Sequence, residues 1–276
     1  MLGSGRTPRV LAIAGSDSGG GAGIQADLKA LARCGVHGMT AITAITAQNT
    51  REVSAVAPVA PDVIVAQVRA VAEDIGVDAV KIGMLGDEPT ILAVHEALSL
   101  LPASTPVVLD PVMVAESGAA LLQPAAARAL VERLLPRATV TTPNLAEAVA
   151  LAGAGPEADA EALARAVHGL GPQAVVVTGG HRRDATDVFY DGARLDAIAG
   201  ERFPDGASHG SGCTHSSALA AHLALGLSPL DAARRAREIA GEAVRRGLRD
   251  VGGGPGPVDA LGIDSARITG AASPLS

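Results

Sequence analysis

The amino-acid sequence predicts an α/β fold in which helices cover both faces of a mostly parallel sheet. Short apolar runs alternate along the chain with longer segments whose apolar residues recur at helical spacing. Wholly apolar strands are typical of a parallel sheet that is buried on both faces. A glycine or a polar residue follows nearly every one of these strands. Ligands bind at the carboxyl ends of the strands in such folds, so this arrangement predicts a binding site at that edge of the sheet.

The alternating part of the chain extends to about residue 180. We expect strands over Val10–Ala14, Met39–Thr46, Ala79–Ile82, Val107–Leu109, Ala138–Thr141 and Ala174–Val177. The segments between them predict helices over Gly21–Arg33, Ala60–Asp74, Glu88–Leu101, Ala125–Leu135, from Asn144 onward and over Ala158–Leu170. Each strand–helix–strand unit favours parallel pairing, because the helix carries the chain back to the end of the sheet at which the previous strand began.

The pattern changes in the last third of the chain. Thr186–Tyr190 and Ala193–Ile198 flank an Asp-Gly dipeptide and predict a hairpin. Two long helices are expected over Thr214–Leu225 and Pro229–Arg246, and the stretch from Gly252 is rich in Gly, Pro, Ser and Ala. Neither an internal repeat nor a linker is visible. We therefore expect one domain over residues 1–276, with a mobile tail from about residue 264.

Composition limits the classes of partner. The chain has 276 residues with two Phe, one Tyr and no Trp, so its core must consist of Ala, Val, Leu and Ile. Stacking of bases on aromatic side chains cannot be a main binding device. The net charge of −7, without a basic run, argues against a nucleic acid or an anionic membrane as partner.

The two cysteines and the N-terminal residues predict a cytoplasmic protein. Cys34 and Cys213 are far apart and form no Cys-x-x-Cys pair, which fits a reducing compartment. Cys34 precedes Gly35 at the end of a helix, where we expect a buried structural thiol. The N-terminus lacks a long apolar region, and no stretch of about 18 apolar residues predicts a membrane span.

The strongest motif is the turn His209-Gly-Ser-Gly-Cys-Thr214, which directly precedes an apolar helix. Glycines allow successive backbone N–H groups to point inward, and the helix N-terminus adds partial positive charge, so the turn can hold a phosphate. We expect the helix start to lower the pKa of the Cys213 thiol, which would then take a proton from a substrate alcohol. The alternative is a capped glycine loop with a buried structural cysteine.

A second glycine-rich segment, Gly15 to Asp27, follows the first strand and opens a helix. It can be fitted to the dinucleotide-binding pattern, which also requires an acid at the end of the second strand. That strand ends in Ala47-Gln48-Asn49, without an acid. We therefore prefer a backbone wall around a small substrate, with Asp17 or Asp27 as a polar contact. The alternative for Asp27 is an exposed acid in the first helical turn.

Acidic residues at strand ends suggest a site for a hard cation. Asp110 follows Val107–Leu109, and Asn144 and Glu147 share one helical face. Asn144 and Glu147 also have the spacing of a capping box, which is the alternative interpretation. Thr178-Gly-Gly-His181 could line a nucleotide, although a surface position is preferred for His181. The histidines lack zinc-ligand spacing, and no P-loop motif occurs.

Several motifs occur in the order found in one enzyme family. They are the segment 13–29 with its glycines, Thr46-Ala-Gln-Asn-Thr50, Lys81-Ile-Gly-Met-Leu85, Leu109-Asp-Pro-Val-Met113, Thr142-Pro-Asn-x-x-Glu147, Thr178-Gly-Gly-His181 and His209-Gly-Ser-Gly-Cys-Thr214. From about Val10 to Leu248 the chain resembles the hydroxymethylpyrimidine/phosphomethylpyrimidine kinases of thiamine biosynthesis, within the ribokinase-like superfamily. The turn has Ser211 where the family more often has threonine, and serine keeps the hydroxyl group.

The resemblance implies a three-layer α/β/α fold with a small β-lid, a homodimer, and the use of ATP and Mg²⁺. The substrate would be 4-amino-5-hydroxymethyl-2-methylpyrimidine and then its monophosphate. Carried over to matching positions, Cys213 would be the base, and Gly210, Ser211 and Gly212 would complete the anion hole. Gly15, Ala22, Gln48, Met84 and Val112 would surround the pyrimidine. Asp110, Glu147 and Asn144 would serve the magnesium-phosphate end, and Thr178 and Gly180 would contact the nucleotide.

Two alternative functions remain at this point. A pyridoxal or pyridoxine kinase of the same superfamily is the nearer one, since Gln48 offers both a donor and an acceptor and could serve either ring. A non-catalytic pyrimidine sensor is the other. The intact set of Cys213, Asp110 and Glu147 argues against a sensor.

Overall fold

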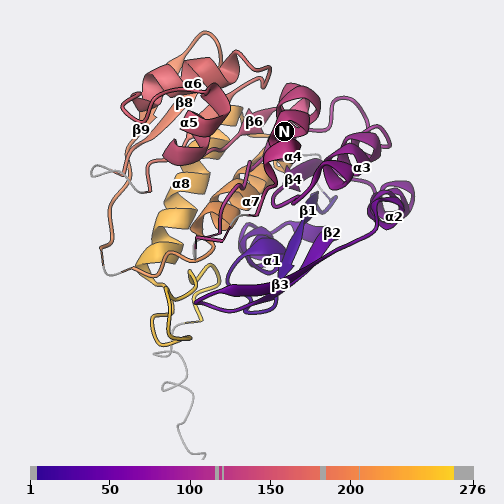
Figure 1. Ribbon diagram of the computed structural model, residues 1–276, viewed down its shortest axis with the longest axis horizontal. Helices are drawn as coiled ribbons and strands as arrows, with labels where there is room; N and C mark the ends of the chain where they lie inside the picture. Colours follow the sequence, from indigo (N-terminus) through magenta and orange to yellow (C-terminus); the bar gives the residue numbers. More distant parts are fainter. Residues whose placement is uncertain (1–4, 116–117, 120, 181–184, 205, 264–276) are drawn as a thin grey trace, which may run out of the picture.

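Nine strands form one sheet in the computed structural model, which describes residues 5–115, 118, 119, 121–180, 185–204 and 206–263. The sheet order is β3-β2-β1-β4-β5-β6-β7-β8-β9 (Figure 1). The parallel strands are β2, β1, β4, β5, β6 and β7. The strand bounds are β1 Arg9–Asp17, β2 His37–Gln48, β3 Val53–Pro58, β4 Ala79–Ile82, β5 Val107–Leu109, β6 Val140–Thr141, β7 Val175–Val177, β8 Asp187–Tyr190 and β9 Leu195–Ile198. The predicted parallel sheet is confirmed.

Helices cover both faces of this sheet in the described part of the chain. Their bounds are α1 Gly23–Arg33, α2 Pro61–Asp74, α3 Glu88–Leu98, α4 Pro124–Ala129, α5 Leu145–Ala152, α6 Ala160–His168, α7 Ser211–Ala224 and α8 Pro229–Arg245. Side chains of successive strand residues point to opposite faces. Leu11 and Ile13 therefore pack with residues of α2, α3, α5 and α6, whereas Val10 packs with residues of α1, α7 and α8. The three predicted layers follow from this alternation.

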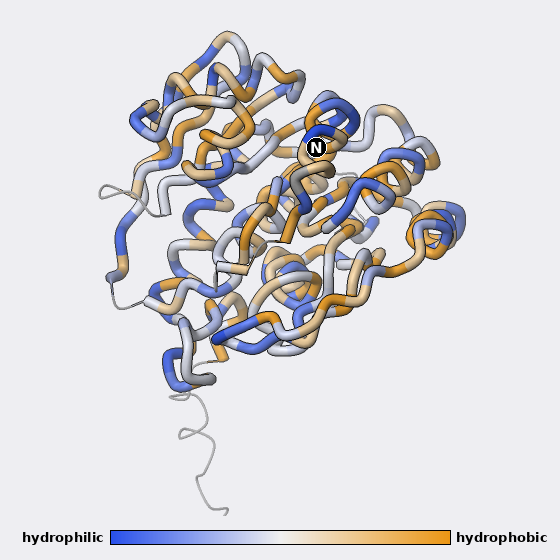
Figure 2. Tube along the Cα trace, viewed as in Figure 1, coloured by the Kyte–Doolittle hydropathy of each residue, from blue (hydrophilic) through white to orange (hydrophobic). Residues whose placement is uncertain are grey.

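The outer helices are amphipathic, as their change of colour from turn to turn in Figure 2 shows. One predicted helix is not continuous. The segment expected to be helical over Ala125–Leu135 begins as α4, continues as a π-helical turn over Leu130–Leu134 and ends in a 3₁₀ turn over Leu135–Arg137. Pro136 lacks the N–H that a regular α-helix needs at this position, which explains the change in winding.

Strand β3 was not predicted. It pairs antiparallel with β2, with Pro58 opposite Ala44 and Val53 opposite Gln48. Because β3 is an edge strand whose residues are almost all exposed, it has no buried apolar run to indicate it. The β2–β3 ribbon corresponds to the small β-lid expected from the resemblance. The predicted hairpin in the last third is confirmed as β8 and β9, with Gly192 at φ +91° in its turn.

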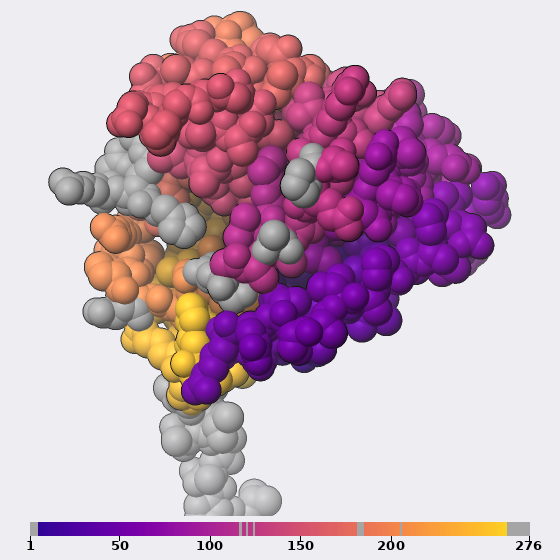
Figure 3. Space-filling model, in the orientation of Figure 1, coloured from indigo at the N-terminus to yellow at the C-terminus, as the bar shows by residue number. Residues whose placement is uncertain are grey.

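The sheet order places a crevice above the centre of the sheet. Strands β2 and β4 lie on either side of β1, so the chain winds in opposite directions from this point. Ligand crevices of open α/β sheets form at such a reversal, at the carboxyl ends of the strands. In Figure 3 the indigo N-terminal, magenta middle and yellow C-terminal segments meet on one face of the molecule.

The chain after α8 returns to the turn that precedes α7. The backbone N–H of His209 donates to the Gly256 carbonyl at 3.2 Å, and the Val258 N–H donates to the His209 carbonyl at 3.0 Å. These two bonds tie residues 256–258 to the cysteine turn. Residues 264–276, where the mobile tail was expected, lie outside the described residues. None of the helices in the described ranges is long and apolar enough to cross a membrane.

Candidate active site

A cavity of about 440 Å³ lies at the carboxyl ends of the parallel strands. Every residue to which the family resemblance assigned a site role lines it. These residues are Gly15, Ala22, Gln48, Met84, Asp110, Val112, Asn144, Glu147, Thr178, Gly180, Gly210, Ser211, Gly212 and Cys213. Residues from both glycine segments and from five strand ends therefore meet around one space of substrate size.

The cysteine turn starts α7 three residues earlier than predicted, at Ser211, so Gly212 and Cys213 belong to the first helical turn. Gly210 has φ +84°, and a Cβ there would lie 1.8 Å from the Gly21 carbonyl oxygen, so only glycine fits. The Ser211 N–H donates to the Ser208 carbonyl at 2.9 Å. Within the described residues, the N–H groups of Gly212 and Cys213 have no acceptor, and these two amides can hold an anion.

The expected low pKa of the Cys213 thiol is wrong for this structure. Burial raises the pKa of the thiol to about 12, although part of the side chain faces the cavity. The Lys81 charge and a hydrogen bond from the Gly23 N–H act in the opposite direction. Desolvation of the thiolate is the largest of these contributions, so it exceeds the effect of the helix N-terminus.

Lys81, whose role the sequence did not reveal, is fully buried beside this turn. Its Nζ lies 2.8 Å from Oδ1 of Asp27, and the Ser217 hydroxyl donates to the same oxygen at 2.8 Å. Burial alone would lower the pKa of Lys81, but the charges of Asp27, Cys213 and Asp110 raise it above its usual value. Lys81 therefore supplies a permanent positive charge below the cavity. Asp27 is its buried partner, neither an exposed acid nor a substrate contact.

Asp110 and Glu147 form a buried acid pair at the cavity wall. The Ser216 hydroxyl donates to Oδ2 of Asp110 at 3.0 Å. Burial, together with the nearby Asp110 charge, raises the pKa of Glu147 to about 8. Two carboxyl groups that disfavour each other's ionisation are stabilised by a cation between them.

The capping interpretation of Asn144 and Glu147 is also confirmed. The Asn144 N–H donates to Oε2 of Glu147 at 2.9 Å, and the Glu147 N–H donates to Oδ1 of Asn144 at 2.9 Å. The described residues contain no group of three or more His, Cys, Asp or Glu side chains that could hold a metal alone. Mg²⁺ is commonly bound by one or two carboxylates, water and substrate phosphates, so the acid pair fits a magnesium-nucleotide complex.

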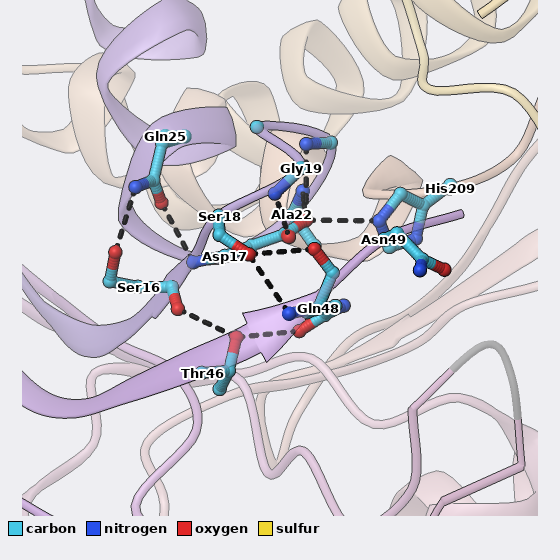
Figure 4. A network of polar contacts seen from close by, with 12 residues as sticks. Ser16, Asp17, Ser18, Gly19, Ala22, Gln25, Thr46, Gln48, Asn49 and His209 are labelled. Carbon is cyan, nitrogen blue, oxygen red and sulfur yellow. Dashed lines mark hydrogen bonds and ion pairs between the residues drawn. The ribbon is translucent and has the colours of Figure 1, made fainter. Parts of the chain in front are cut away.

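Asp17 organises the first glycine segment from inside. Its carboxylate accepts from the N–H groups of Gly19, Gly21 and Ala22 at 2.8, 3.1 and 2.8 Å (Figure 4). The Nε2 atom of His209 lies 3.0 Å from Oδ2 of the same carboxylate. Asp17 is only 2% exposed, so its carboxylate is used by the protein itself. Asp17 lines the cavity and holds its wall in shape, and its proposed contact with a substrate stays a prediction.

One end of the cavity is suited to an aromatic ring with polar edges. Gly15 lies at a bulge in β1, and a Cβ at this position would lie 2.6 Å from Cε of Met84. Met84 thus packs against the bare backbone of Gly15, and both residues line the cavity. The Thr46 hydroxyl donates to Oε1 of Gln48 at 3.2 Å (Figure 4). No acceptor for the Gln48 amide nitrogen occurs in the described ranges, so this group can donate to a ligand.

The opposite end contains a buried polar cluster that sequence reasoning missed. Thr178 and Gly180 line this end, and the Gly179 N–H donates to Oδ1 of Asp187 at 2.7 Å. His215 from α7 and Arg237 from α8 lie against Asp187 and also line the cavity. No motif indicated them, because they come from three different elements. His181 lies outside the described residues.

An amide-lined helix start, a buried acid pair and a thiol surround one cavity on an α/β fold, and these features define a phosphotransferase. The sequence matches the phosphomethylpyrimidine kinase family over residues 17–259, and the chain belongs to this family.

Individual relatives agree with this assignment. The chain is 48% identical to a hydroxymethylpyrimidine/phosphomethylpyrimidine kinase of Rhizobium meliloti over 258 residues, which cover 91% of this chain and 96% of the relative. It is 44% identical to the thiamine biosynthesis bifunctional protein ThiED of Geobacter sulfurreducens, covering 91% of this chain and 51% of that protein. The pyridoxal kinase of Staphylococcus aureus in complex with AMP-PCP and pyridoxal superposes with a TM-score of 0.84 at 37% identity, covering 93% and 94% of the two chains. The expected ribokinase-like fold is thereby confirmed.

Proposed function

We propose that this chain transfers the terminal phosphoryl group of ATP to the hydroxymethyl group of 4-amino-5-hydroxymethyl-2-methylpyrimidine, and then phosphorylates the monophosphate to the diphosphate. The observation that carries the proposal is the arrangement of the cavity. The Gly212 and Cys213 amides line the same cavity as Gln48 and Met84 and as the acid pair of Asp110 and Glu147. An acceptor alcohol and a phosphoryl donor can therefore meet at the amides.

In the proposed reaction, the hydroxymethyl oxygen attacks the γ-phosphorus and the bond to the bridging oxygen of ADP breaks. The Gly212 and Cys213 N–H groups hold the oxygens on which charge develops. Lys81 adds a fixed positive charge nearby. We assign to Cys213 the role of accepting the hydroxyl proton. A thiol with a pKa near 12 holds its proton at neutral pH, so only the minor thiolate form, whose proton has already passed to solvent, can accept the hydroxyl proton. The Lys81 charge and the Gly23 N–H are the groups that stabilise this thiolate.

We further propose that ATP binds with Mg²⁺, held by Asp110 and Glu147 with Asn144 beside them. The ion would neutralise charge on the transferring phosphoryl group. Thr178 and Gly180 would contact the nucleotide, and Gly15, Ala22 and Val112 would enclose the ring with Gln48 and Met84. The raised pKa of Glu147 beside Asp110 supports this placement, because a cation would favour ionisation of both acids.

The test is ATP consumption by the purified chain, first with the hydroxymethylpyrimidine and then with its monophosphate, followed by phosphorus NMR of the products. We expect both compounds to be phosphorylated in the presence of Mg²⁺. Turnover of neither compound would refute the proposal. Turnover of the first alone would limit the proposal to the first step.

Pyridoxal is the second candidate substrate. It is supported by the similarity in structure to the Staphylococcus aureus pyridoxal kinase, whose complex contains pyridoxal. The Gln48 amide nitrogen can donate to a ring nitrogen of either compound, so this contact does not choose between them. Competition between the two compounds decides: a higher kcat/KM for pyridoxal would reverse the assignment.

We also propose a single-domain chain that acts as a homodimer in the cytoplasm. The single sheet of nine strands supports the first point, and two free cysteines fit a reducing compartment. Neither a nucleic acid nor a membrane is expected as a partner of a chain with a net charge of −7. Sedimentation equilibrium tests the homodimer.

A further inference from the structure

The cavity contains a buried histidine that no part of the proposed reaction uses. His215 lies on α7, two residues after Cys213, and is only 4% exposed. Both of its ring nitrogens lack a hydrogen-bond partner among the residues that the structure describes. A buried polar group without a partner costs free energy of folding, so such groups often mark the place of a ligand or a water molecule.

The surroundings of His215 are charged on two sides. Its Nε2 lies 3.5 Å from Oδ2 of Asp187, which is fully buried, and these atoms form no hydrogen bond. Arg237 approaches the other carboxylate oxygen of Asp187, at 3.8 Å, and donates to the Ala185 carbonyl. Asp187 in turn accepts the Gly179 N–H, next to the proposed nucleotide contacts. Asp187 therefore joins the histidine, the arginine and the nucleotide wall.

On its other side, His215 faces the phosphate end of the site. Ser216, the next residue, donates to Asp110, and the His215 ring is close enough to Asp110 to favour the charged form of that acid. The ring thus lies between the acid of the proposed metal site and the Thr178–Gly180 turn. His215 lines the same cavity as Thr178, Gly180 and Cys213, so it is placed in the space where a nucleotide would lie.

We propose that His215 binds the polyphosphate chain of the nucleotide, with Asp187 and Arg237 as positioning residues. An imidazolium donates from both ring nitrogens, so one N–H can meet Asp187 and the other a phosphate oxygen. Asp187 fixes the ring, and Arg237 balances the charge of Asp187. This inference rests on the proposed function for the identity of the nucleotide, but its own test is binding and needs no turnover.

The test compares nucleotide binding by the wild-type chain and three variants, using calorimetry with AMP-PCP and with AMP. His215→Leu keeps the bulk and removes both donors, and His215→Gln restores one donor. His222→Leu is the matched control, because His222 lies on the same helix outside the cavity and its Nδ1 contacts the Ala218 carbonyl. Circular dichroism and melting curves verify that each variant is folded.

We expect His215→Leu to weaken AMP-PCP binding roughly tenfold or more, which corresponds to the ~1.4 kcal/mol of a charge-assisted hydrogen bond. AMP, which lacks the β- and γ-phosphates, should bind with unchanged affinity. His215→Gln should recover part of the loss, and His222→Leu should bind both nucleotides like the wild type. In turnover assays, His215→Leu should raise the KM for ATP and leave the KM for the pyrimidine within about twofold.

Two results would overturn the inference. Unchanged AMP-PCP affinity in His215→Leu would show that the ring has no nucleotide role. An equal loss for AMP and AMP-PCP would indicate damage to the cavity rather than a lost phosphate contact. If the wild type bound AMP-PCP but phosphorylated neither pyrimidine compound, the proposed function would fail while the result for His215 would stand.

Discussion

The imidazole of His209 and the carboxylate of Asp17 meet at 3.0 Å although 192 residues separate them in the sequence. Asp17 ends β1 and holds the first glycine segment, and His209 opens the turn before Cys213. One buried carboxylate therefore sets the position of the substrate wall relative to the two amides that would bind phosphate. Burial alone would raise the pKa of Asp17, but hydrogen bonds from His209, Ala22 and Gly19 outweigh it and lower the pKa below the usual value.

Asp17→Asn should destabilise the fold and do so in a pH-dependent way. Asparagine cannot accept all four hydrogen bonds, so we expect a loss of about 2 kcal/mol or more at pH 7. The lowered pKa of Asp17 means that its contribution is present above the ordinary aspartate pKa near 4 and is lost as the pH falls through the folded value. Urea unfolding at pH 7 and at pH 3 measures both effects. The exposed Asp74→Asn is the control, and an equal loss in both variants would contradict the prediction.

Glu147 should contribute to stability with the opposite pH dependence, and Glu147→Gln should remove that dependence. The pKa of Glu147 is raised to about 8, so the folded chain keeps a proton that the unfolded chain releases near the usual pKa of 4.5. Its contribution to stability is present below that value and is lost as the pH rises towards 8. Without metal, the wild type should lose roughly 2–4 kcal/mol between pH 5 and 8 through this group. Glutamine keeps the capping box and should remove this slope.

Melting curves of the metal-free chain across this range test the prediction. A slope that persists in Glu147→Gln would place the titration elsewhere. The same shift has a consequence for the proposed metal, because binding of Mg²⁺ requires ionised carboxylates. We expect Mg²⁺ in the nucleotide complex to bind more tightly as the pH rises from 6 to 8 in the wild type, and this dependence should be weaker in the variant.

Replacing only one residue of the Lys81–Asp27 pair should lower the free energy of unfolding more than replacing both residues. Lys81→Met or Asp27→Asn alone leaves a charge buried without its partner, which typically costs ~3–5 kcal/mol. The double variant should be much closer to the wild type in unfolding free energy, because no unpaired charge remains. Activity should not recover with stability, since the positive charge near Cys213 is absent. Additive losses in the double variant would show that the two side chains are not energetically coupled.

Cys213→Ala should lower kcat by about 100-fold or more, while calorimetry gives a hydroxymethylpyrimidine affinity within twofold of the wild type. The physical reason is that the variant lacks the proposed proton acceptor but keeps the residues that are proposed to enclose the pyrimidine ring. Cys34→Ala is the control, because Cys34 packs at the end of α1 against the core outside the cavity. Unchanged turnover in Cys213→Ala would disprove the base role and leave the Gly212 and Cys213 amides as the catalytic groups.

Gly210→Ala should disrupt the fold at the turn. A Cβ there meets the Gly21 carbonyl at 1.8 Å in addition to the strain of φ +84°, so we expect a loss well above the ~1–2 kcal/mol of the strain alone. Gly226→Ala is a matched control at the other end of α7. Gly226 has a similar φ of +88°, but nothing lies within 4 Å of its added Cβ. Equal losses in thermal unfolding would contradict the role of the close approach.

The strand ends carried most of what the sequence could predict about the site. Residues such as Asp110 and Gln48 follow apolar runs that predict strands. The carboxyl ends of parallel strands lie at the same end of the sheet, so these residues meet at the cavity whatever their adjacent residues are. The raised pKa of Cys213 could not be predicted, because the position of α7 relative to the solvent depends on how the layers pack. The sequence shows that Cys213 lies at a helix start, where the helix dipole lowers a thiol pKa. It does not show how far burial desolvates the thiolate and raises that pKa.

Residues that act through long-range contacts were missed for a similar reason. Lys81 lies inside an apolar strand, where its charge is compatible only with a partner from another element. His215 and Asp187 come from α7 and β8, and nothing in their local sequence joins them. Strand β3 was missed because an edge strand whose residues are almost all exposed lacks the buried apolar run that identifies central strands.

The bonds between His209 and the backbone at Gly256 and Val258 determine when the cysteine turn can form during synthesis of the chain. A chain emerging from the ribosome can form β1, the first glycine segment and the acid pair long before residue 258 is made. The cysteine turn, in contrast, acquires both of its backbone supports only when these late residues are available. A nascent chain that has completed α8 but not residue 258 would therefore contain nearly the whole sheet and still have an unsecured phosphate site. The capacity to bind nucleotide should arise late in translation, after most of the protein is already compact.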